Sequence, residues 1–339
     1  MHRATPYRLI GLCIVISLLV GCERRQHLVE QHLLEFGTII DITMISSDLL
    51  KAERLLGEIE QRLRQQRDQW HAWEDSDLSR FNQQLRQNSS AEIPPSLVKL
   101  LELSRQYHDA TGGLFNPAMG KLIGAYGFHG GAVDAELVAS LRLDIPDMQD
   151  LSIVGNHAST TNPQLQIDLG GIAKGYAISL IGEFLDANGI KHYVINAGGD
   201  MLLAGNRFGR PWRIGIQNPF APGVIASVEL QGKHSLFTSG NYERSYHLGD
   251  KLQHHIIDPR SGEPSRGQSS ATVLDSDPVR ADVAATALMI DGLQRHRELS
   301  KSLGIKDFLV ISESREIQIS QSLAQKIDIL THWPVIIID

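Results

Sequence analysis

The chain has 339 residues, of which 42% are hydrophobic and 21% are charged, a composition typical of a globular protein with a sizeable core. Its formal net charge is −7, so it lacks the basic excess of nucleic-acid-binding proteins, and we expect no nucleic acid among its partners. Both cysteines lie within the first 22 residues, so the rest of the chain has no thiol for a disulfide, a thiolate metal site or a cysteine nucleophile.

The first 21 residues have the pattern of a secretory signal peptide. Two arginines precede an apolar run over 9–20 that is too short to span a bilayer. The run ends in Leu-Val-Gly-Cys, which resembles the lipobox of bacterial lipoproteins, in which the cysteine carries the lipid. We therefore expect a signal peptide over 1–21, a lipid on Cys22, a polar tether over 22–31 and a location on the periplasmic side of a bacterial membrane. The alternative is a plain signal peptide in which Cys22 has no role.

We expect the folded part, 32–339, to be one compact domain without an internal linker. Its first half is predicted to contain a strand with a turn at Phe36-Gly37-Thr38, an amphipathic helix, an aromatic-rich loop leading into a turn, and a second helix stopped by two glycines. In chain order these elements are 33–45, 49–69, 70–82 and 95–111.

The second half begins with a predicted strand over 165–169 and a helix over 173–185 that stops at Asn188-Gly189. Strands then follow over 193–273, before a pair of helices and terminal strands that include Val335 to Ile338. Several consecutive strands are spaced as in hairpins: 212–217, 224–230 and 235–238. This pattern favours an α+β fold with mixed, largely antiparallel sheets and packed helices over a doubly wound parallel sheet.

The segment from Ile167 to Tyr176 places a strand, two glycines and a helix start in succession. Lys174 falls in the first turn of that helix, where the helix dipole disfavours a cation by about 0.3–1 kcal/mol. A bound anion would reverse this effect, because free N–H groups and a lysine together suit a phosphate. The alternative is a glycine-containing turn with a solvated lysine.

Three further segments have residues suited to ligand chemistry. The glycines before Leu114-Phe115-Asn116 allow close backbone approach, and Phe115 either stacks on a planar ligand or packs in the core. Thr238-Ser239-Gly240 either offers hydroxyls to a phosphate or ribose or forms an ordinary turn. His254 and His255 are adjacent strand residues that face opposite ways, so at most one points into a given site, and either one alone suits a structural or solvated role as well.

The last segment of this kind begins a helix. Asp277 suits the N-cap and Pro278 the first helical position, which puts Asp282 and Thr286 one turn apart on the same face. A carboxylate and a hydroxyl are hard oxygen ligands that suit a magnesium ion shared with substrate phosphates. In the alternative, Thr286 bonds back to the carbonyl of Asp282, whose carboxylate lies in solvent.

Together and in this order, the segments resemble the ApbE family of flavin transferases, periplasmic lipoproteins that transfer FMN from FAD to proteins. The similarity runs from the turn at 36–38 to the segment 281–286, which is nearly the whole mature chain. The family's loop after its first long helix matches 75–82. The strongest matches are Asp168 to Gly175, Asn196 to Asp200, Thr238 to Gly240 and His255 to Pro259.

The resemblance implies roles for individual residues. It implies magnesium bound by a backbone oxygen at Gly171 and by the side chains of Asp282 and Thr286. It also implies a catalytic base at His255, with His254 standing where a small residue is usual. The residues expected to bind FAD are Phe36, Leu114, Phe115, Asn116, Asp168, Lys174 and Ile257.

Two positions depart from the family's pattern. Phe36 stands where a methionine is common, and Ala72 stands where many members have a tyrosine that contacts the flavin. Trp70 or Trp73 is therefore the expected source of an aromatic surface for the isoalloxazine ring.

The resemblance further implies a Mg²⁺-dependent reaction in which a threonine hydroxyl of a partner flavoprotein attacks FAD and AMP is released. The expected acceptors are subunits of sodium-pumping NADH:quinone reductases, Rnf-type complexes and related periplasmic redox proteins. Two alternatives stay open. The first is a Mg²⁺-dependent FAD pyrophosphatase, in which water replaces the threonine and free FMN is formed. The second is a non-catalytic flavin-binding lipoprotein.

Overall fold

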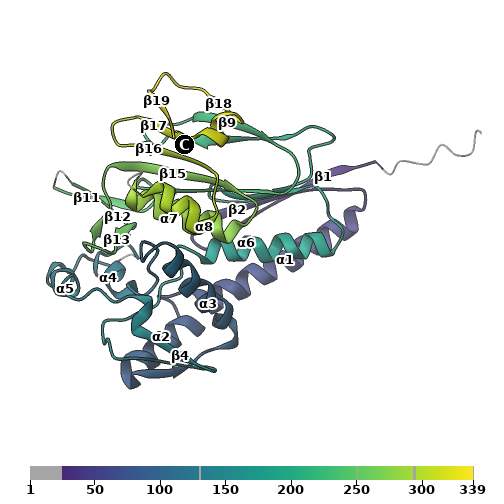
Figure 1. Ribbon diagram of the computed structural model, residues 1–339. Helices are drawn as coiled ribbons and strands as arrows, with labels where there is room; N and C mark the ends of the chain where they lie inside the picture. Colours follow the sequence, from purple (N-terminus) through teal and green to yellow (C-terminus); the bar gives the residue numbers. More distant parts are fainter. Residues whose placement is uncertain (1–24, 130, 250, 293–294, 339) are drawn as a thin grey trace, which may run out of the picture.

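The computed structural model describes residues 25–129, 131–249, 251–292 and 295–338, and its largest element is a nine-stranded sheet (Figure 1). Neighbouring strands are antiparallel throughout, except for the parallel pair at one edge, β17 and β19. The strand order is β1 (His27–Glu35), β2 (Thr38–Ser46), β6 (Tyr193–Ala197), β7 (Asp200–Ala204), β10 (His234–Gly240), β15 (Gln268–Asp275), β16 (Asp307–Ser312), β17 (Ile317–Ser320) and β19 (Val335–Ile338). The sheet confirms the predicted α+β class.

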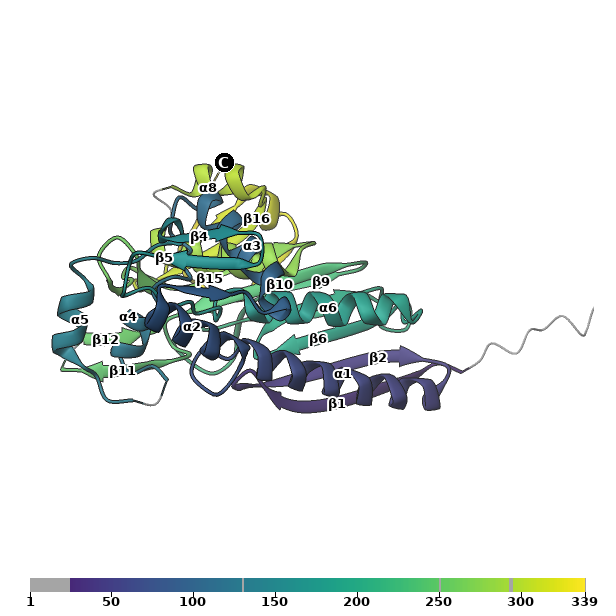
Figure 2. The ribbon, with the colours of Figure 1, turned by 90° about the horizontal axis from the view of Figure 1, so that it is seen from below.

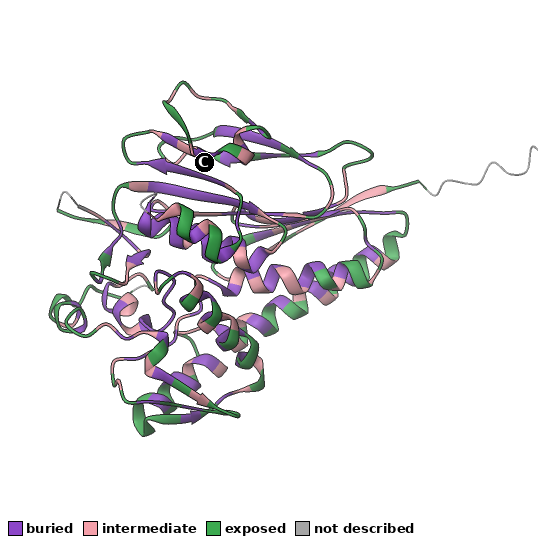
Figure 3. Ribbon diagram, viewed as in Figure 1, coloured by how far each residue is buried: buried purple, intermediate pink, exposed green. Residues whose placement is uncertain are grey.

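Both faces of this sheet are covered. Figure 1 shows helices below it, namely α1 (Leu49–Trp70), α6 (Ala173–Ala187), α7 (Pro278–Asp291) and α8 (His296–Leu303). Above it lie α9 (Gln321–Ala324) and a three-stranded sheet of β18 (Ile327–Ile329), β9 (Val224–Leu230) and β8 (Trp212–Gln217). Because successive strand residues face opposite ways, Val310 packs into the helical core while Leu309 and Ile311 pack into the other core. The centre of the sheet is accordingly buried (Figure 3).

The remaining elements lie beyond the helical face of the sheet and at one end of the molecule (Figure 2). The first group comprises α2 (Asp77–Asn88), β3 (Ser90–Glu92), α3 (Pro95–Ala110), η2 (Met148–Asp150), β4 (Leu151–Val154) and β5 (His157–Thr160). The second comprises α4 (Gly120–Ala125), α5 (Ala135–Leu141), β11 (Ser245–Leu248), β12 (Lys251–His254), β13 (Ile257–Asp258) and β14 (Glu263–Pro264).

The sequence signals for helix ends are confirmed at several positions. The Asp277 side chain caps α7 by accepting hydrogen bonds from the backbone N–H groups of Val279 and Arg280. Helix α6 ends at Asn188 and is followed by Gly189, whose φ of +74° is a conformation that glycine adopts readily. The predicted helices over 49–69 and 95–111 correspond to α1 and α3 within one residue at each end.

The N-terminal boundary differs from the prediction. The turn at Phe36 and Gly37 is confirmed, with φ values of +53° and +71°, and it joins two long strands in a hairpin. Strand β1 pairs with β2 along its full length from His27, so residues 27–31 belong to the sheet and not to a tether. The polar residues of β1 lie on an edge strand and their side chains are partly exposed. The sequence alone therefore does not show that they pair with β2.

Three internal predictions are corrected. Part of the predicted loop over 70–82 is helix α2, because Ser76 and Ser79 form a reciprocal capping box. The segment 165–169 is not a strand, since its only ladder contact is a single bridge between Gln166 and Met119. Strand β10 does not form a hairpin with β9, because it pairs with β7 and β15 in the large sheet.

The predicted signal peptide and Cys22 lie outside the described residues. Among the residues that are described, none of the helices has the length and apolar character needed to cross a membrane.

Candidate active site

A cavity of about 970 Å³, a volume that includes its open mouth, lies between the start of α6, helix α7 and the segments 114–119 and 255–257. Its size is within the range of small-molecule and cofactor sites. It is lined by all but one of the residues that the sequence predicts to bind flavin or magnesium or to act as base: Leu114, Phe115, Asn116, Asp168, Gly171, Lys174, His255, Ile257, Asp282 and Thr286.

The 114–116 wall of the cavity is held by buried hydrogen bonds. The backbone N–H of Phe115 donates to the hydroxyl of Thr111 at 3.0 Å. Asn116 donates from its side chain to the carbonyl of Pro146 at 2.8 Å and accepts from the N–H of Ala118 at 3.1 Å. The Asn116 amide is therefore engaged with backbone groups, and it fixes the wall on which Leu114 and Phe115 face the cavity.

Asp168 lies in the same wall, next to an aromatic pair. Its carboxylate accepts from the N–H of Gly170 at 2.9 Å and is 3.7 Å from the imidazole of His129. Burial opposes its ionisation, but His129, the Gly170 amide and Arg244 together hold the pKa of Asp168 below its usual value. The His129 ring stacks on Trp73 with centroids 4.3 Å apart, so this ionised carboxylate is next to a planar surface.

At the start of α6, Lys174 is paired with a buried carboxylate. Its ammonium forms a short ion pair with Asp200, whose other oxygen accepts from the N–H of Thr238 at 3.0 Å. Burial lowers the pKa of Lys174, but the charges of Asp200, Asp282 and Glu243 outweigh this effect and raise it above its usual value. Lys174 is therefore charged, and it is not the solvated lysine of the alternative reading.

Helices α6 and α7 approach each other closely at Gly175. A Cβ atom at this position would lie 2.7 Å from the carbonyl oxygen of Pro278 and 2.9 Å from the Cβ of Asp282, so only glycine fits. The close approach lets the N–H of Gly175 donate to a carboxylate oxygen of Asp282 at 2.9 Å. The start of α6 thus fixes the orientation of the Asp282 side chain.

The three predicted magnesium ligands lie together. The Thr286 hydroxyl is 3.1 Å from that of Ser239 and 3.3 Å from the carbonyl of Asp282, so the back-bond expected in the alternative reading is present. Its oxygen is 3.9 Å from the ideal Cβ position of Gly171. The Asp282 carboxyl, however, is buried and not in solvent. Burial, followed by the charge of Asp200, raises the pKa of Asp282, while Lys174 and the N–H of Gly175 act in the opposite direction.

Only one of the two adjacent histidines lines the cavity, as predicted. His254 is fully buried elsewhere, where its ring bonds to the carbonyl of Ser265 at 2.8 Å. His255 lines the cavity, and its buried Nδ1 has no hydrogen-bond partner among the described residues. Burial, then the charge of Arg244, lower the pKa of His255 to about 3, so its imidazole is neutral at pH 7.

The predicted aromatic contacts require correction. Phe36 does not line the cavity, because it packs at the β1–β2 turn with its ring centroid 6.4 Å from that of Trp70. Trp70 in turn packs against Tyr176, and neither tryptophan lines the cavity. The Trp73 ring stacks on the ring of His129, which itself lines the cavity.

Four titratable residues of the cavity were missed by the sequence analysis as site residues: His129, Asp200, Glu243 and Arg244. Asp200 ends a glycine motif that the resemblance included, and Arg244 follows Thr238-Ser239-Gly240 closely, so proximity to these motifs was an available signal. In the described part of the chain, the Arg244 guanidinium forms neither a hydrogen bond nor an ion pair, unlike Lys174.

Comparison with known proteins supports one assignment. Residues 36–309 match the model of the ApbE family. An FAD:protein FMN transferase of Rhodobacter capsulatus is 36% identical over 83% of this chain, which spans only about half, 55%, of that protein's length. An FAD:protein FMN transferase of Vibrio cholerae serotype O1 is 33% identical over 87% of this chain and 91% of its own.

Solved structures agree with this match. The ApbE protein of Thermotoga maritima has a TM-score of 0.80 and 25% identity, covering 88% of this chain and 99% of its own. The flavin transferase ApbE of Vibrio cholerae has a TM-score of 0.74 and 28% identity, covering 89% of this chain and all of its own.

Proposed function

The chain belongs to the ApbE family and is a flavin transferase, and from this premise we propose that it moves FMN from FAD to a threonine hydroxyl of a partner protein, with Mg²⁺ and with release of AMP. One observation carries the proposal: a single cavity contains a hard oxygen donor set, two cations and a neutral imidazole. The alternatives are FAD hydrolysis and flavin binding without catalysis, and they become outcomes of the test.

The donor set of the cavity fits Mg²⁺. Asp282 and Thr286 offer side-chain oxygens and Gly171 a backbone carbonyl, and a bound cation would stabilise the ionised form of the buried Asp282 carboxyl. Magnesium is usually held by only one or two carboxylates together with substrate phosphates, which matches this short set. When bound, the ion would neutralise charge that develops on the phosphate oxygens.

The residues of the chain have separate roles in the proposed reaction. Lys174 and Arg244 provide positive charge for the diphosphate of FAD, and the stacked His129–Trp73 pair offers a planar surface beside it. The acceptor's threonine oxygen forms a bond to the phosphorus on the FMN side, the bond from that phosphorus to the AMP oxygen breaks, and AMP leaves. The neutral His255 takes the threonine proton.

The proposal is tested by mixing the protein, FAD and Mg²⁺ with a threonine-bearing acceptor. Expected acceptors are periplasmic subunits of sodium-pumping NADH:quinone reductases or Rnf-type complexes. Transfer gives flavin fluorescence that stays with the acceptor under denaturing conditions, and an acceptor with valine in place of the threonine stays dark. Free FMN without labelled acceptor would indicate a pyrophosphatase, and unchanged FAD would indicate a binding protein.

Replacing Arg244 by glutamine is expected to weaken FAD binding by about 10- to 100-fold, because a charge-assisted hydrogen bond contributes about 1.5–3 kcal/mol. The reason is that Arg244 is the cavity's unpaired guanidinium among the described residues, whereas Lys174 is paired with Asp200. Fluorescence titration with FAD measures the effect, and riboflavin, which has no phosphate, serves as the matched ligand. An equal loss for both ligands would contradict a phosphate-binding role.

The N-terminal motif supports a proposal about location. We propose that Cys22 carries a lipid and holds the protein on the periplasmic side of a bacterial membrane, as the pattern before it indicates. Replacing Cys22 by serine is expected to release the protein into the soluble fraction with its transfer activity intact. Fractionation followed by the acceptor assay measures both properties. A variant that stays in the membrane pellet would contradict the lipobox assignment.

A further inference from the structure

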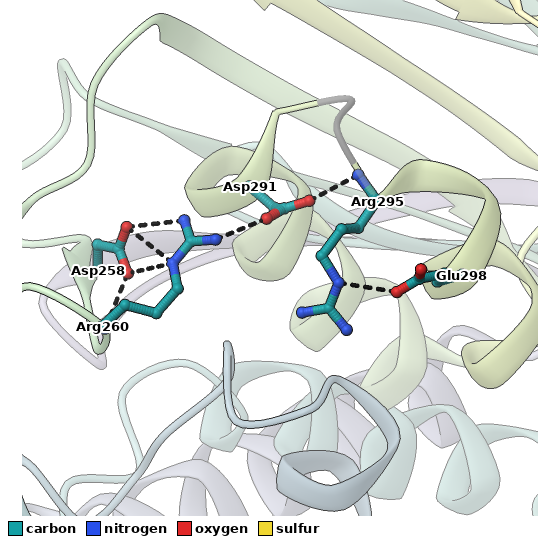
Figure 4. Close-up of polar contacts among 5 residues, drawn as sticks. All are labelled: Asp258, Arg260, Asp291, Arg295 and Glu298. Atoms are coloured by element: carbon teal, nitrogen blue, oxygen red, sulfur yellow. Dashed lines mark hydrogen bonds and ion pairs between the residues drawn. The ribbon is translucent and has the colours of Figure 1, made fainter.

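A network of charged side chains connects the turn after His255 to the end of helix α7 (Figure 4). The Arg260 guanidinium donates to both carboxylate oxygens of Asp258, at 2.7–3.1 Å. It also donates to Asp291, the last residue of α7, at 2.9 Å. The other oxygen of Asp291 accepts from the backbone N–H of Arg295 at 2.8 Å. Arg260 therefore bridges two carboxylates on different elements.

Asp291 is in an unfavourable place for a carboxylate. Its side chain is only 1% exposed, and it lies at the C-terminal end of a helix, where the helix dipole disfavours negative charge. Burying a charge destabilises a protein unless the charge is paired. Arg260 and the Arg295 N–H provide that pairing. Because such an ion pair contributes little net stability, its main effect is to fix the geometry of the elements that it joins.

The two elements joined by Arg260 contribute different groups to the cavity. Asp258 directly follows Ile257 and is three residues after His255, and its carbonyl accepts from Ser261 and Gly262 to close a tight turn. Helix α7 carries Asp282 and Thr286. At 1.5 Å per residue, Asp291 lies about 13 Å along the helix from Asp282, outside the cavity.

We propose that Arg260 is a positioning residue that locks the turn behind His255 and Ile257 onto the helix that carries Asp282 and Thr286. This inference rests on the proposed transferase reaction and adds a residue that touches neither FAD nor metal. Arg260 does not line the cavity, and its side chain is half exposed. Arg260 therefore acts by holding His255 at the correct distance from the groups of the cavity that bind metal and phosphate.

Among the residues that the structure describes, the other polar contacts of the turn do not reach α7. On its far side, the Tyr126 hydroxyl donates to the carbonyl of Gly262 at 2.8 Å, and Arg142 donates to the carbonyl of Ser261 at 3.0 Å. These bonds attach the turn to α4 and the end of α5. Without Arg260 the turn keeps its own shape and these attachments, but loses its ionic connection to α7.

The test uses three variants: Arg260→Met, Asp291→Asn and the double variant that combines these two substitutions. Lys326→Met is the control variant. Lys326 is a matched control, because it is a half-exposed cation paired with a mostly buried carboxylate, Asp307, and does not line the cavity. Transfer kinetics with FAD and acceptor give kcat and the KM for FAD. Hydrogen exchange of the peptide 255–262 reports the attachment of the turn without requiring activity.

We expect kcat to fall about 10- to 100-fold in Arg260→Met with little change in the KM for FAD, because small misplacements of reacting groups cost this much. The double variant is expected to be no slower than the worse single variant. The exchange of 255–262 is expected to rise in Arg260→Met and in the double variant, but not in Lys326→Met. If Arg260→Met fails to fold, Arg260→Lys, which keeps the charge but not the bidentate geometry, is expected to give an intermediate loss.

Two results would overturn the inference. The first is unchanged exchange of 255–262 in Arg260→Met, which needs no transfer activity. The second is a kcat equal to that of the parent protein, or a loss equal to that of Lys326→Met. Absence of transfer in the parent protein would instead reject the proposed function, so the two failures are distinguishable.

Discussion

Replacing Asp282 by alanine is expected to abolish FMN transfer at ordinary magnesium concentrations. Asp282 is the buried carboxylate of a short donor set that otherwise offers a hydroxyl and a backbone carbonyl, so its loss removes the set's charged ligand. FAD binding is expected to weaken only modestly, because Lys174 and Arg244 remain. Transfer rates at increasing magnesium, together with FAD titration, measure the two effects separately.

The matched variant is Asp282→Asn, which keeps the shape and can still accept a hydrogen bond from the N–H of Gly175. Its activity should lie between those of the parent protein and Asp282→Ala, and excess metal should restore it in part. Metal affinity of the parent protein should rise when FAD is present, since the phosphates complete the coordination. Full activity of Asp282→Ala in the presence of a chelator would remove the metal from the mechanism.

Replacing His255 by alanine is expected to slow transfer by about 10²- to 10⁴-fold while FAD still binds, as is typical when a general base is removed. His255 lines the cavity, and its buried Nδ1 has no partner in the described structure. The matched variant is His254→Ala, which removes a buried ring that bonds to the carbonyl of Ser265 and does not line the cavity. Equal losses per folded molecule in both variants would contradict the assignment.

The pH dependence follows from the environment of His255. Its pKa is lowered to about 3 by burial and by the charge of Arg244, so the free protein has a neutral imidazole throughout pH 5–8. The pH dependence of kcat/KM reports the pKa values of groups in the free enzyme. It should therefore show no inflection that arises from His255 between pH 5 and 8. An inflection near pH 6.5 that disappears in His255→Ala would show that the imidazole titrates normally and would contradict this environment.

Local sequence signals predicted much of the helical structure and most of the cavity. The Asp277-Pro278 start fixed the register of α7, and this register placed Asp282 and Thr286 on the cavity face. His255 lines the cavity and His254 does not, as predicted, but the premise of alternation along one strand was wrong, because β12 ends at His254. These features depend on residues close together in the chain, where periodicity and capping are informative.

Features that depend on distant residues were missed. The partner of Lys174 is Asp200, which lies on the next strand pair, whereas local electrostatics offered only a phosphate or solvent as the lysine's surroundings. The segment 165–169 alternates like a strand, but its neighbours are the irregular residues 117–119 and the start of α4, so no ladder forms. Phe36 stands at a position where the family commonly has methionine, yet it packs against Trp70 outside the cavity.

The most direct test of the account measures three products of one reaction: AMP, free FMN and flavin bound covalently to the acceptor. With the parent protein, FAD, Mg²⁺ and a threonine-bearing acceptor, we expect one bound flavin for each AMP released and no accumulation of free FMN. The same mixture with His255→Ala or Asp282→Ala should form neither AMP nor bound flavin at a comparable rate. AMP matched by free FMN, with the acceptor unlabelled, would contradict the assignment of this cavity to flavin transfer.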